Sequence, residues 1–128
     1  MAKTALVTGA SSGIGREIAR DLSARGFRVI LSARREERLR ELAEELGDNT
    51  RVIVCDVSDR EECLRLYEET KNEKISVLVN CAGFGAVGSF DKLPLDTELK
   101  MIDTNVTAVH MLTKLFLKDF VAADKGYI

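Results

Sequence analysis

The run that decides the fold is Thr8-Gly9-Ala10-Ser11-Ser12-Gly13-Ile14-Gly15, near the start of a 128-residue chain. An apolar, β-prone run (4–7) leads into it, and a helical pattern (16–25) follows. A strand, a glycine-rich turn and a helix form an anion site, because the glycines allow a tight turn and the first free amides of the helix face the anion. The spacing Gly-x-x-x-Gly-x-Gly matches the generic Gly-x-Gly-x-x-Gly fingerprint in context only. We therefore predict a bound dinucleotide here; the alternative is a plain turn rich in Gly and Ser.

The composition predicts one domain, covering residues 1–128, with an aliphatic core. Hydrophobic residues make up 45% of the chain and charged residues 31%, whereas aromatic residues make up only 5%. Acids and bases are interleaved and the formal net charge is −2, which argues against nucleic acid as a partner. No leader follows Met1 and no apolar run approaches a membrane span, so we expect a cytoplasmic protein with no membrane partner.

The three cysteines are Cys55, Cys63 and Cys81, an odd number without the paired spacing of metal ligands. We expect buried, reduced thiols and no metal site. Cys81 is not expected to be a catalytic thiol, because no histidine lies near it in sequence.

Strand and helix patterns alternate along the chain without a linker. The predicted strands are 3–8, 28–33, 51–55 and 75–79, and the predicted helices are 14–25, 36–46 and one that ends near Thr70. Ser58 is expected to cap this third helix, with Glu61 completing a capping box and Leu64 on the apolar side. The later segments are predicted as a loop (81–93), a helix start at Pro94, a helix in two pieces (95–123) with an irregularity at 103–105, and the start of a fifth strand (126–128).

Repeating strand–helix units imply a parallel sheet with right-handed crossovers. We predict an α/β fold, a Rossmann-type doubly wound parallel sheet that is incomplete, with strands 1–4 and the start of strand 5 in the order 3-2-1-4. Such sheets bind cofactors at the carboxyl ends of the strands, where the strand order reverses. Gly13, Asp56 and Asn80 all fall at that edge, so three motifs point to one site.

These motifs resemble those of the short-chain dehydrogenase/reductase family, in its N-terminal half only. The matching pieces are Thr8–Gly15, Cys55-Asp56-Val57, Leu78-Val79-Asn80-Cys81-Ala82-Gly83 and Asn105-Val106-Thr107. The extended branch of the family has its second glycine one residue earlier, where Ser12 stands here, so epimerase-type members are disfavoured. The family usually has a second Asn at the place of Cys81, a departure without an explanation.

The resemblance implies a cofactor site. Three glycines would hold the pyrophosphate, Ile14 would lie beside the nicotinamide half, and Asp56 would accept a hydrogen bond from the adenine amino group while Val57 packs on the ring. The cofactor-binding residues implied are Gly9, Ser11, Ser12, Gly13, Ile14, Gly15, Arg34, Arg35, Asp56, Val57, Asn80, Ala82 and Gly83. A turn acid is the alternative interpretation of Asp56.

The resemblance also implies one catalytic residue within this chain, Asn105, which would sit at a helix break and order a water in a proton relay. Asn is a poor helix former, so its place inside a helical pattern has a reason, either this role or a simple polar kink.

The end of the second strand, Ser32-Ala33-Arg34-Arg35, indicates the preferred coenzyme. Proteins that prefer NAD usually end this strand with an acid that binds the ribose 2′-hydroxyl. The acid is absent here and Arg34 stands where a 2′-phosphate needs a guanidinium, with Ser11, Ser32 and Arg35 as further donors. We predict NADP(H) over NAD. In the alternative, the arginines only solvate a helix start, where positive charge is mildly unfavourable.

The family's chemistry also needs a Ser after the fifth strand and a Tyr-x-x-x-Lys on the next helix, and neither is found in this chain. Tyr67 and Lys71 match the bare spacing, but they follow the third strand, so we interpret the match as chance. The resemblance therefore implies the cofactor-binding half of an NADP(H)-dependent oxidoreductase, inactive alone, that transfers a hydride between nicotinamide and a carbonyl or alcohol substrate.

Two other functions are alternatives to this one. A non-catalytic nucleotide-binding or interaction module stays open, and a flavodoxin-type protein is disfavoured by the first loop and the arginines. Truncation, a separately made half and a naturally short protein also stay open. Apolar residues of the long helix cover more surface than one sheet face can bury, and family helices of this kind pair between subunits, so we expect a homo-oligomer; these residues are Val106, Val109, Leu112, Leu115, Phe116, Phe120 and Val121.

Overall fold

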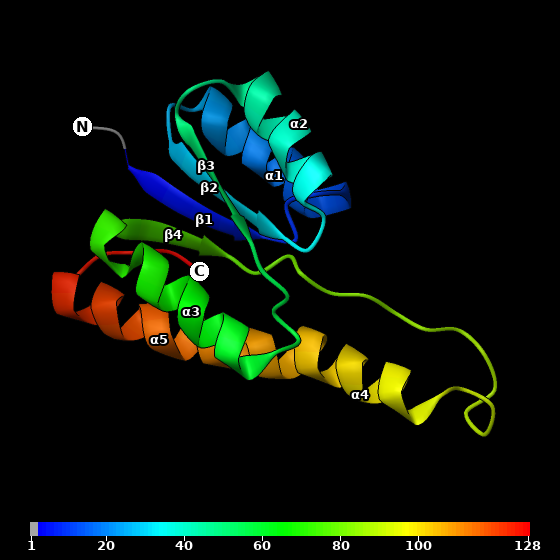
Figure 1. The fold of residues 1–128 in the computed structure, drawn as a ribbon. Helices are drawn as coiled ribbons and strands as arrows, with labels where there is room; N and C mark the ends of the chain where they lie inside the picture. The colour runs from blue at the N-terminus through cyan, green and yellow to red at the C-terminus, as the bar shows by residue number, and fades with distance from the viewer. Residues whose placement is uncertain (1–2) are drawn as a thin grey trace.

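The computed structural model describes residues 3–128 as a parallel sheet with helices on both faces (Figure 1). The strands are β1 (Thr4–Thr8), β2 (Arg28–Ala33), β3 (Thr50–Val54) and β4 (Ile75–Val79). Their order in the sheet is β3-β2-β1-β4, and each neighbouring pair is parallel. The predicted Rossmann-type α/β fold and its 3-2-1-4 order are confirmed.

The helices follow the strands in the expected alternation. They are α1 (Gly13–Ala24), α2 (Glu36–Leu46), α3 (Arg60–Thr70), the 3-10 turn η1 (Lys71–Glu73), α4 (Leu95–Ile102), the π-helical turn η2 (Asp103–Thr107) and α5 (Ala108–Ala123). Helices α1 and α2 cover one face of the sheet and α3 and α5 the other, while α4 extends past its edge (Figure 1). The irregularity expected in the long helix is η2.

Both faces of the sheet are buried, because side chains alternate between two apolar layers. Leu6 and Ile30 pack with Phe116 in the layer on the α3 and α5 side. Val7 and Leu31 pack in the opposite layer, on the α1 and α2 side. Burial on both sides explains why β1 and β2 appear in the sequence as continuous apolar runs.

Asp59, not Ser58, caps α3. The Asp59 carboxylate accepts a hydrogen bond from the Glu61 amide at 2.9 Å, and the helix begins at Arg60. The Ser58 hydroxyl instead donates to Asp56 Oδ1 at 2.7 Å. The capping-box prediction was wrong because it overlooked this nearer acceptor for Ser58. Leu64 was also misplaced, since 43% of it is exposed.

The last residues of the chain lie beside β4, as expected for the start of a fifth strand. The Leu78 amide donates to the Tyr127 carbonyl at 2.9 Å, and the Tyr127 amide donates to the Ser76 carbonyl at 3.0 Å. This pairing amounts to one parallel bridge between Val77 and Tyr127. Within residues 3–128, no helix combines the length and the apolarity needed to cross a membrane.

Glu73 ties β2 to the neighbouring edge strand β3 at the end of the sheet where the strands begin. Its carboxylate accepts hydrogen bonds from Arg28 of β2 and Arg51 of β3, and its side chain is only 19% exposed. Burial works to raise the pKa of Glu73, but the two guanidinium groups outweigh it and hold this pKa below its ordinary value.

A Glu73→Gln variant is expected to lower the free energy of unfolding by about 1–3 kcal/mol at pH 7, because two charge-assisted hydrogen bonds are weakened. A carboxylate with a lowered folded-state pKa stabilises the fold above its unfolded pKa, and this contribution is lost as pH falls through the folded value. Urea unfolding between pH 7 and pH 3 should therefore show the difference from the parent shrinking with acidity. Glu44→Gln, exposed on α2, is the control; an equal loss at all pH values would contradict the ion-pair account.

Candidate functional site

The turn between β1 and α1 lies against the chain that leaves β4. Gly9 has φ of +63°, and a Cβ on it would lie 2.6 Å from the carbonyl carbon of Cys81. A Cβ on Gly15 would lie 2.3 Å from the Gly9 carbonyl oxygen. Backbone therefore packs on backbone at these two positions, and no side chain fits between. Gly13, with φ of +55°, has no atom within 4 Å of its Cβ position and opens into free space.

Thr8 joins the same two segments through hydrogen bonds. Its hydroxyl oxygen accepts from the amides of Cys81 and Ala82, both at 3.2 Å, and its hydroxyl donates to the Val79 carbonyl at 3.3 Å. The side chain is buried at the end of β1. It holds the end of β4 in register with the glycine turn, a role that the sequence motifs did not indicate.

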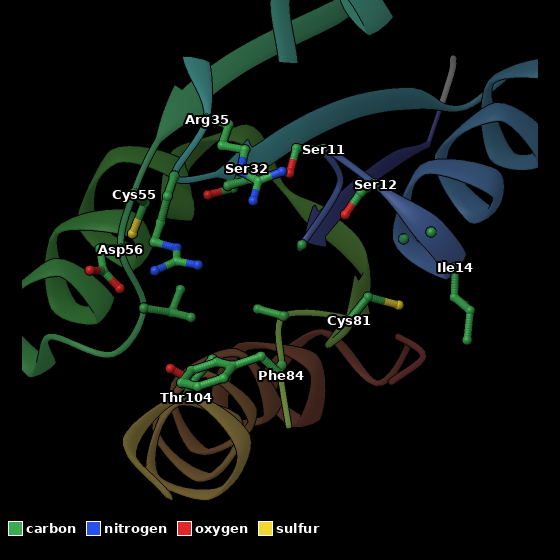
Figure 2. Close-up of a pocket in the computed structure, with 18 residues that line it drawn as sticks. Ser11, Ser12, Ile14, Ser32, Arg35, Cys55, Asp56, Cys81, Phe84 and Thr104 are labelled. Atoms are coloured by element: carbon green, nitrogen blue, oxygen red, sulfur yellow. The ribbon is translucent and has the colours of Figure 1, made fainter. Parts of the chain in front are cut away.

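A cavity of about 420 Å³ opens at the carboxyl ends of the strands (Figure 2). The glycine turn forms one wall, the ends of β2 and β3 form another, and the segment after β4 closes the third side. The predicted cofactor residues that line it are Gly9, Ser11, Ser12, Gly13, Ile14, Gly15, Arg34, Arg35, Asp56, Val57, Ala82 and Gly83. Segments far apart in the sequence thus meet where the fold predicted one site.

Ser32, expected from the sequence as a further donor to the coenzyme, also lines the cavity, and so do five residues that were not among the predicted cofactor-binding residues: Ala33, Cys55, Cys81, Phe84 and Thr104. Ser32, Ala33 and Cys55 end β2 or follow β3 directly. The rule that parallel sheets bind ligands at the carboxyl ends of their strands accounts for all three, although only Ser32 was expected from the sequence to contact the coenzyme. Phe84 and Thr104 carry no such signal, since they come from the loop after β4 and from η2.

Asn80 and Asn105 do not line the cavity, and both hold neighbouring elements in place. The Asn80 amide donates from Nδ2 to the Thr113 hydroxyl of α5 at 3.1 Å. Asn105 makes a reciprocal pair with the backbone of Phe84: Oδ1 accepts from the amide at 2.9 Å, and Nδ2 donates to the carbonyl at 2.7 Å. The η2 turn therefore positions the loop that carries Gly83 and Phe84 at the cavity.

The helix α1 presents its first amides without a side-chain cap. Its N-cap residue is Ser12, whose hydroxyl makes no capping hydrogen bond, and no acidic residue occurs in the first turn. Helix N-termini carry unpaired N–H groups and a partial positive charge. These amides lie at the cavity wall and suit an anion such as a phosphate.

Two guanidinium groups stand at the end of β2, where α2 begins. Arg34 and Arg35 line the cavity and are exposed. Within the described part of the chain, neither arginine takes part in an ion pair or a side-chain hydrogen bond. The acids of the α2 first turn, Glu36 and Glu37, lie on the helix and not in the cavity.

Asp56 lies across the cavity from the glycine turn and is held in its ionised form. Burial works to raise the pKa of Asp56, but hydrogen bonds from the Ser58 hydroxyl (2.7 Å) and amide (3.0 Å) outweigh it. Lys100, at 3.8 Å from Oδ2, and Arg34 act in the same direction, so the pKa lies below its ordinary value. The Ser58 amide bond is that of a turn acid, so both interpretations of Asp56 remain.

Tyr67 is excluded as a catalytic tyrosine of this cavity. Its hydroxyl donates to Asp119 Oδ2 of α5 at 2.7 Å, which raises the pKa of Tyr67 to about 12. Its nominal partner Lys71 pairs with Glu68 at 2.6 Å. A catalytic tyrosinate needs a lowered pKa, so the match to Tyr-x-x-x-Lys is chance, as interpreted from the sequence.

The cysteines are free thiols. Burial raises the pKa of Cys55 to about 12 and that of Cys63 to about 11, and it also raises the pKa of the half-buried Cys81. None of the three is activated as a nucleophile. Within residues 3–128, no three His, Cys, Asp or Glu side chains group as a metal site.

Residues 3–128 match the family model for short chain dehydrogenase. The chain belongs to the short-chain dehydrogenase family. A 3-oxoacyl-[acyl-carrier-protein] reductase of Rickettsia prowazekii is 37% identical, across 98% of this chain and 52% of the relative. An uncharacterized oxidoreductase of Staphylococcus saprophyticus is 36% identical, across 98% of this chain and 56% of the relative. The chain therefore spans about half the length of the curated relatives it matches.

Solved structures of the family show the same fold. A metagenomic short-chain oxidoreductase in complex with NADP is 33% identical with a TM-score of 0.91, across 97% of this chain and 58% of that one. A short-chain dehydrogenase from Sphingobium yanoikuyae in complex with NADPH is 29% identical with a TM-score of 0.91, across 97% and 50%. The α/β architecture and strand order derived above are those of this family.

A Gly9→Ala variant is expected to lose about 2–5 kcal/mol of stability, because an added methyl group overlaps the Cys81 backbone and L residues are strained at positive φ. Gly13→Ala should lose only about 1–2 kcal/mol, since it adds strain without overlap. Gly47→Ala is the matched control, with φ of +93° and open space at its Cβ position far from the site. Chemical denaturation measures all three; equal losses at Gly9 and Gly47 would contradict the close packing of the turn on β4.

Proposed function

We propose that this chain is the cofactor-binding part of an NADP(H)-dependent oxidoreductase that interconverts a carbonyl and an alcohol. The observation that carries the proposal is the pair of unpaired guanidinium groups at the end of β2, in the same cavity as the uncapped N-terminus of α1. NADPH carries three phosphates in two places, a pyrophosphate and a 2′-phosphate. The 2′-phosphate, a dianion, matches the two guanidinium groups, and the pyrophosphate matches the N-terminus of α1.

The residues present fit such a coenzyme. The tight glycine turn brings backbone amides to the cavity wall, where a pyrophosphate can approach them closely. Arg34 and Arg35 would bind the 2′-phosphate, and Asp56 with Val57 would bind the adenine, at the far wall of the cavity. Ile14 is 75% exposed and would pack against the nicotinamide half.

When bound, the coenzyme would supply or accept a hydride at its nicotinamide ring. The residues of this chain would bind and orient it, and the substrate would approach past the loop that Asn105 fixes through Phe84. The proposed proton-relay role of Asn105 stays a prediction, and so does cofactor binding by Asn80. We propose no turnover by this chain alone, because Tyr67 lies outside the cavity and is bound to Asp119.

The relatives support this class of reaction. Several are named as 3-oxoacyl-[acyl-carrier-protein] reductases, and two solved neighbours are complexes with NADP or NADPH. A carbonyl or alcohol substrate is therefore part of the proposal. The homo-oligomer expected from the sequence stays a prediction that sedimentation tests; side chains left exposed along the long helix include Leu99, Ile102, Val106 and Val121.

An Arg34→Ala variant is expected to bind NADPH about 10–100-fold more weakly than the parent, because a charge-assisted pair with the 2′-phosphate is lost. Its affinity for NADH should stay within about twofold, since NADH lacks that phosphate. Calorimetric or fluorescence titration measures both. Arg38→Ala, an exposed arginine on α2 outside the cavity lining, is the control. Equal affinity of the parent for the two coenzymes, or equal losses in the variant, would contradict the assignment of NADP(H).

A further inference from the structure

Ser32 carries a buried hydroxyl that is not satisfied within the protein. The residue is 1% exposed, and its Oγ has no hydrogen-bond partner among residues 3–128. The other buried hydroxyl side chains of the site differ: Thr8 makes three hydrogen bonds, and Thr104 donates to the Lys100 carbonyl at 2.8 Å. Buried polar atoms are nearly always paired, so an orphaned one in a cavity wall indicates a partner that arrives from outside.

The position of Ser32 indicates which part of a ligand it meets. In the sheet Ser32 lies between Thr8 of β1 and Ile53 of β3, and it lines the cavity (Figure 2). Its carbonyl accepts from the Ala10 amide at 3.1 Å, which fixes it to the glycine turn. A molecule that extends through the cavity from the glycine turn to Asp56 passes Ser32.

The sequence predicts Ser32 as a further donor to the 2′-phosphate, but the buried position of its hydroxyl is a poor match for that group. Arg34 and Arg35 are exposed, whereas Ser32 is buried and neutral. A dianion is stabilised beside solvent and guanidinium groups, and a buried hydroxyl suits a neutral polar atom.

We propose that Ser32 Oγ hydrogen-bonds a neutral polar atom of the adenosine diphosphate portion that NADH and NADPH share, and not the 2′-phosphate. The inference rests on the proposed coenzyme site and adds a binding residue to it. Ser32 then contributes affinity for both coenzymes, whereas Arg34 distinguishes between them.

The proposal predicts opposite effects on stability and on binding. In the ligand-free protein the unpaired buried hydroxyl destabilises the fold, so Ser32→Ala should leave the melting temperature unchanged or raise it. The same variant should bind ADP, NADH and NADPH each about three- to tenfold more weakly, because one neutral hydrogen bond is lost.

Ser76→Ala is the matched control. Ser76, like Ser32, lies in a strand, although it is only partly buried. Its hydroxyl donates to the Thr4 carbonyl at 3.2 Å, and the residue does not line the cavity. This variant should lower the melting temperature and leave all three affinities unchanged. Thermal unfolding of the ligand-free proteins and titration calorimetry with the three nucleotides give both readouts.

The outcomes separate this inference from the proposed function. Unchanged affinities in Ser32→Ala, a loss confined to NADPH, or a melting temperature that falls as far as in Ser76→Ala would each overturn the role of Ser32 while leaving the coenzyme site standing. A Ser32→Ala chain that fails to fold would also overturn it, since removal of an unpaired hydroxyl cannot destabilise so strongly. Absence of binding of all three nucleotides to the parent would overturn both.

Discussion

The close approach of the β1–α1 turn to the end of β4 is the constraint on which the site depends. Gly9 and Cys81 are in backbone contact that no side chain at position 9 would permit, and Thr8 fastens the same two segments with three hydrogen bonds. This contact places the start of α1 and the loop after β4 on adjoining walls of one cavity.

The charged groups around the cavity favour an anionic ligand. The uncapped end of α1 and the two arginines after β2 make two separate regions that favour anions, and Asp56 is kept ionised between Ser58, Lys100 and Arg34. Cationic groups without a partner at a cavity bind anions readily, because no internal ion pair has to be broken first. Placement of these charges is therefore the physical basis of the proposed preference for NADP(H).

The sequence predicted the structure best where a strand–helix unit repeats along the chain or where a short motif such as the glycine turn defines the local backbone. Strand order followed from the repeated strand–helix units of a doubly wound sheet, and one wall of the cavity followed from Gly9, Gly13 and Gly15. It was least informative where a side chain chooses among several partners. Ser58 bonds Asp56 and leaves the helix cap to Asp59, and Asn105 bonds the backbone of a loop more than twenty residues away. Such choices depend on three-dimensional distances that spacing along a chain does not encode.

The most direct test follows the backbone amides of the isotope-labelled protein by NMR while NADPH is added. The account predicts that chemical-shift changes concentrate in three segments that end parallel strands: 9–15, 32–35 and 55–57. Changes confined to α4 and α5, or no changes at millimolar NADPH, would contradict the claim that a dinucleotide binds at the carboxyl edge of this sheet.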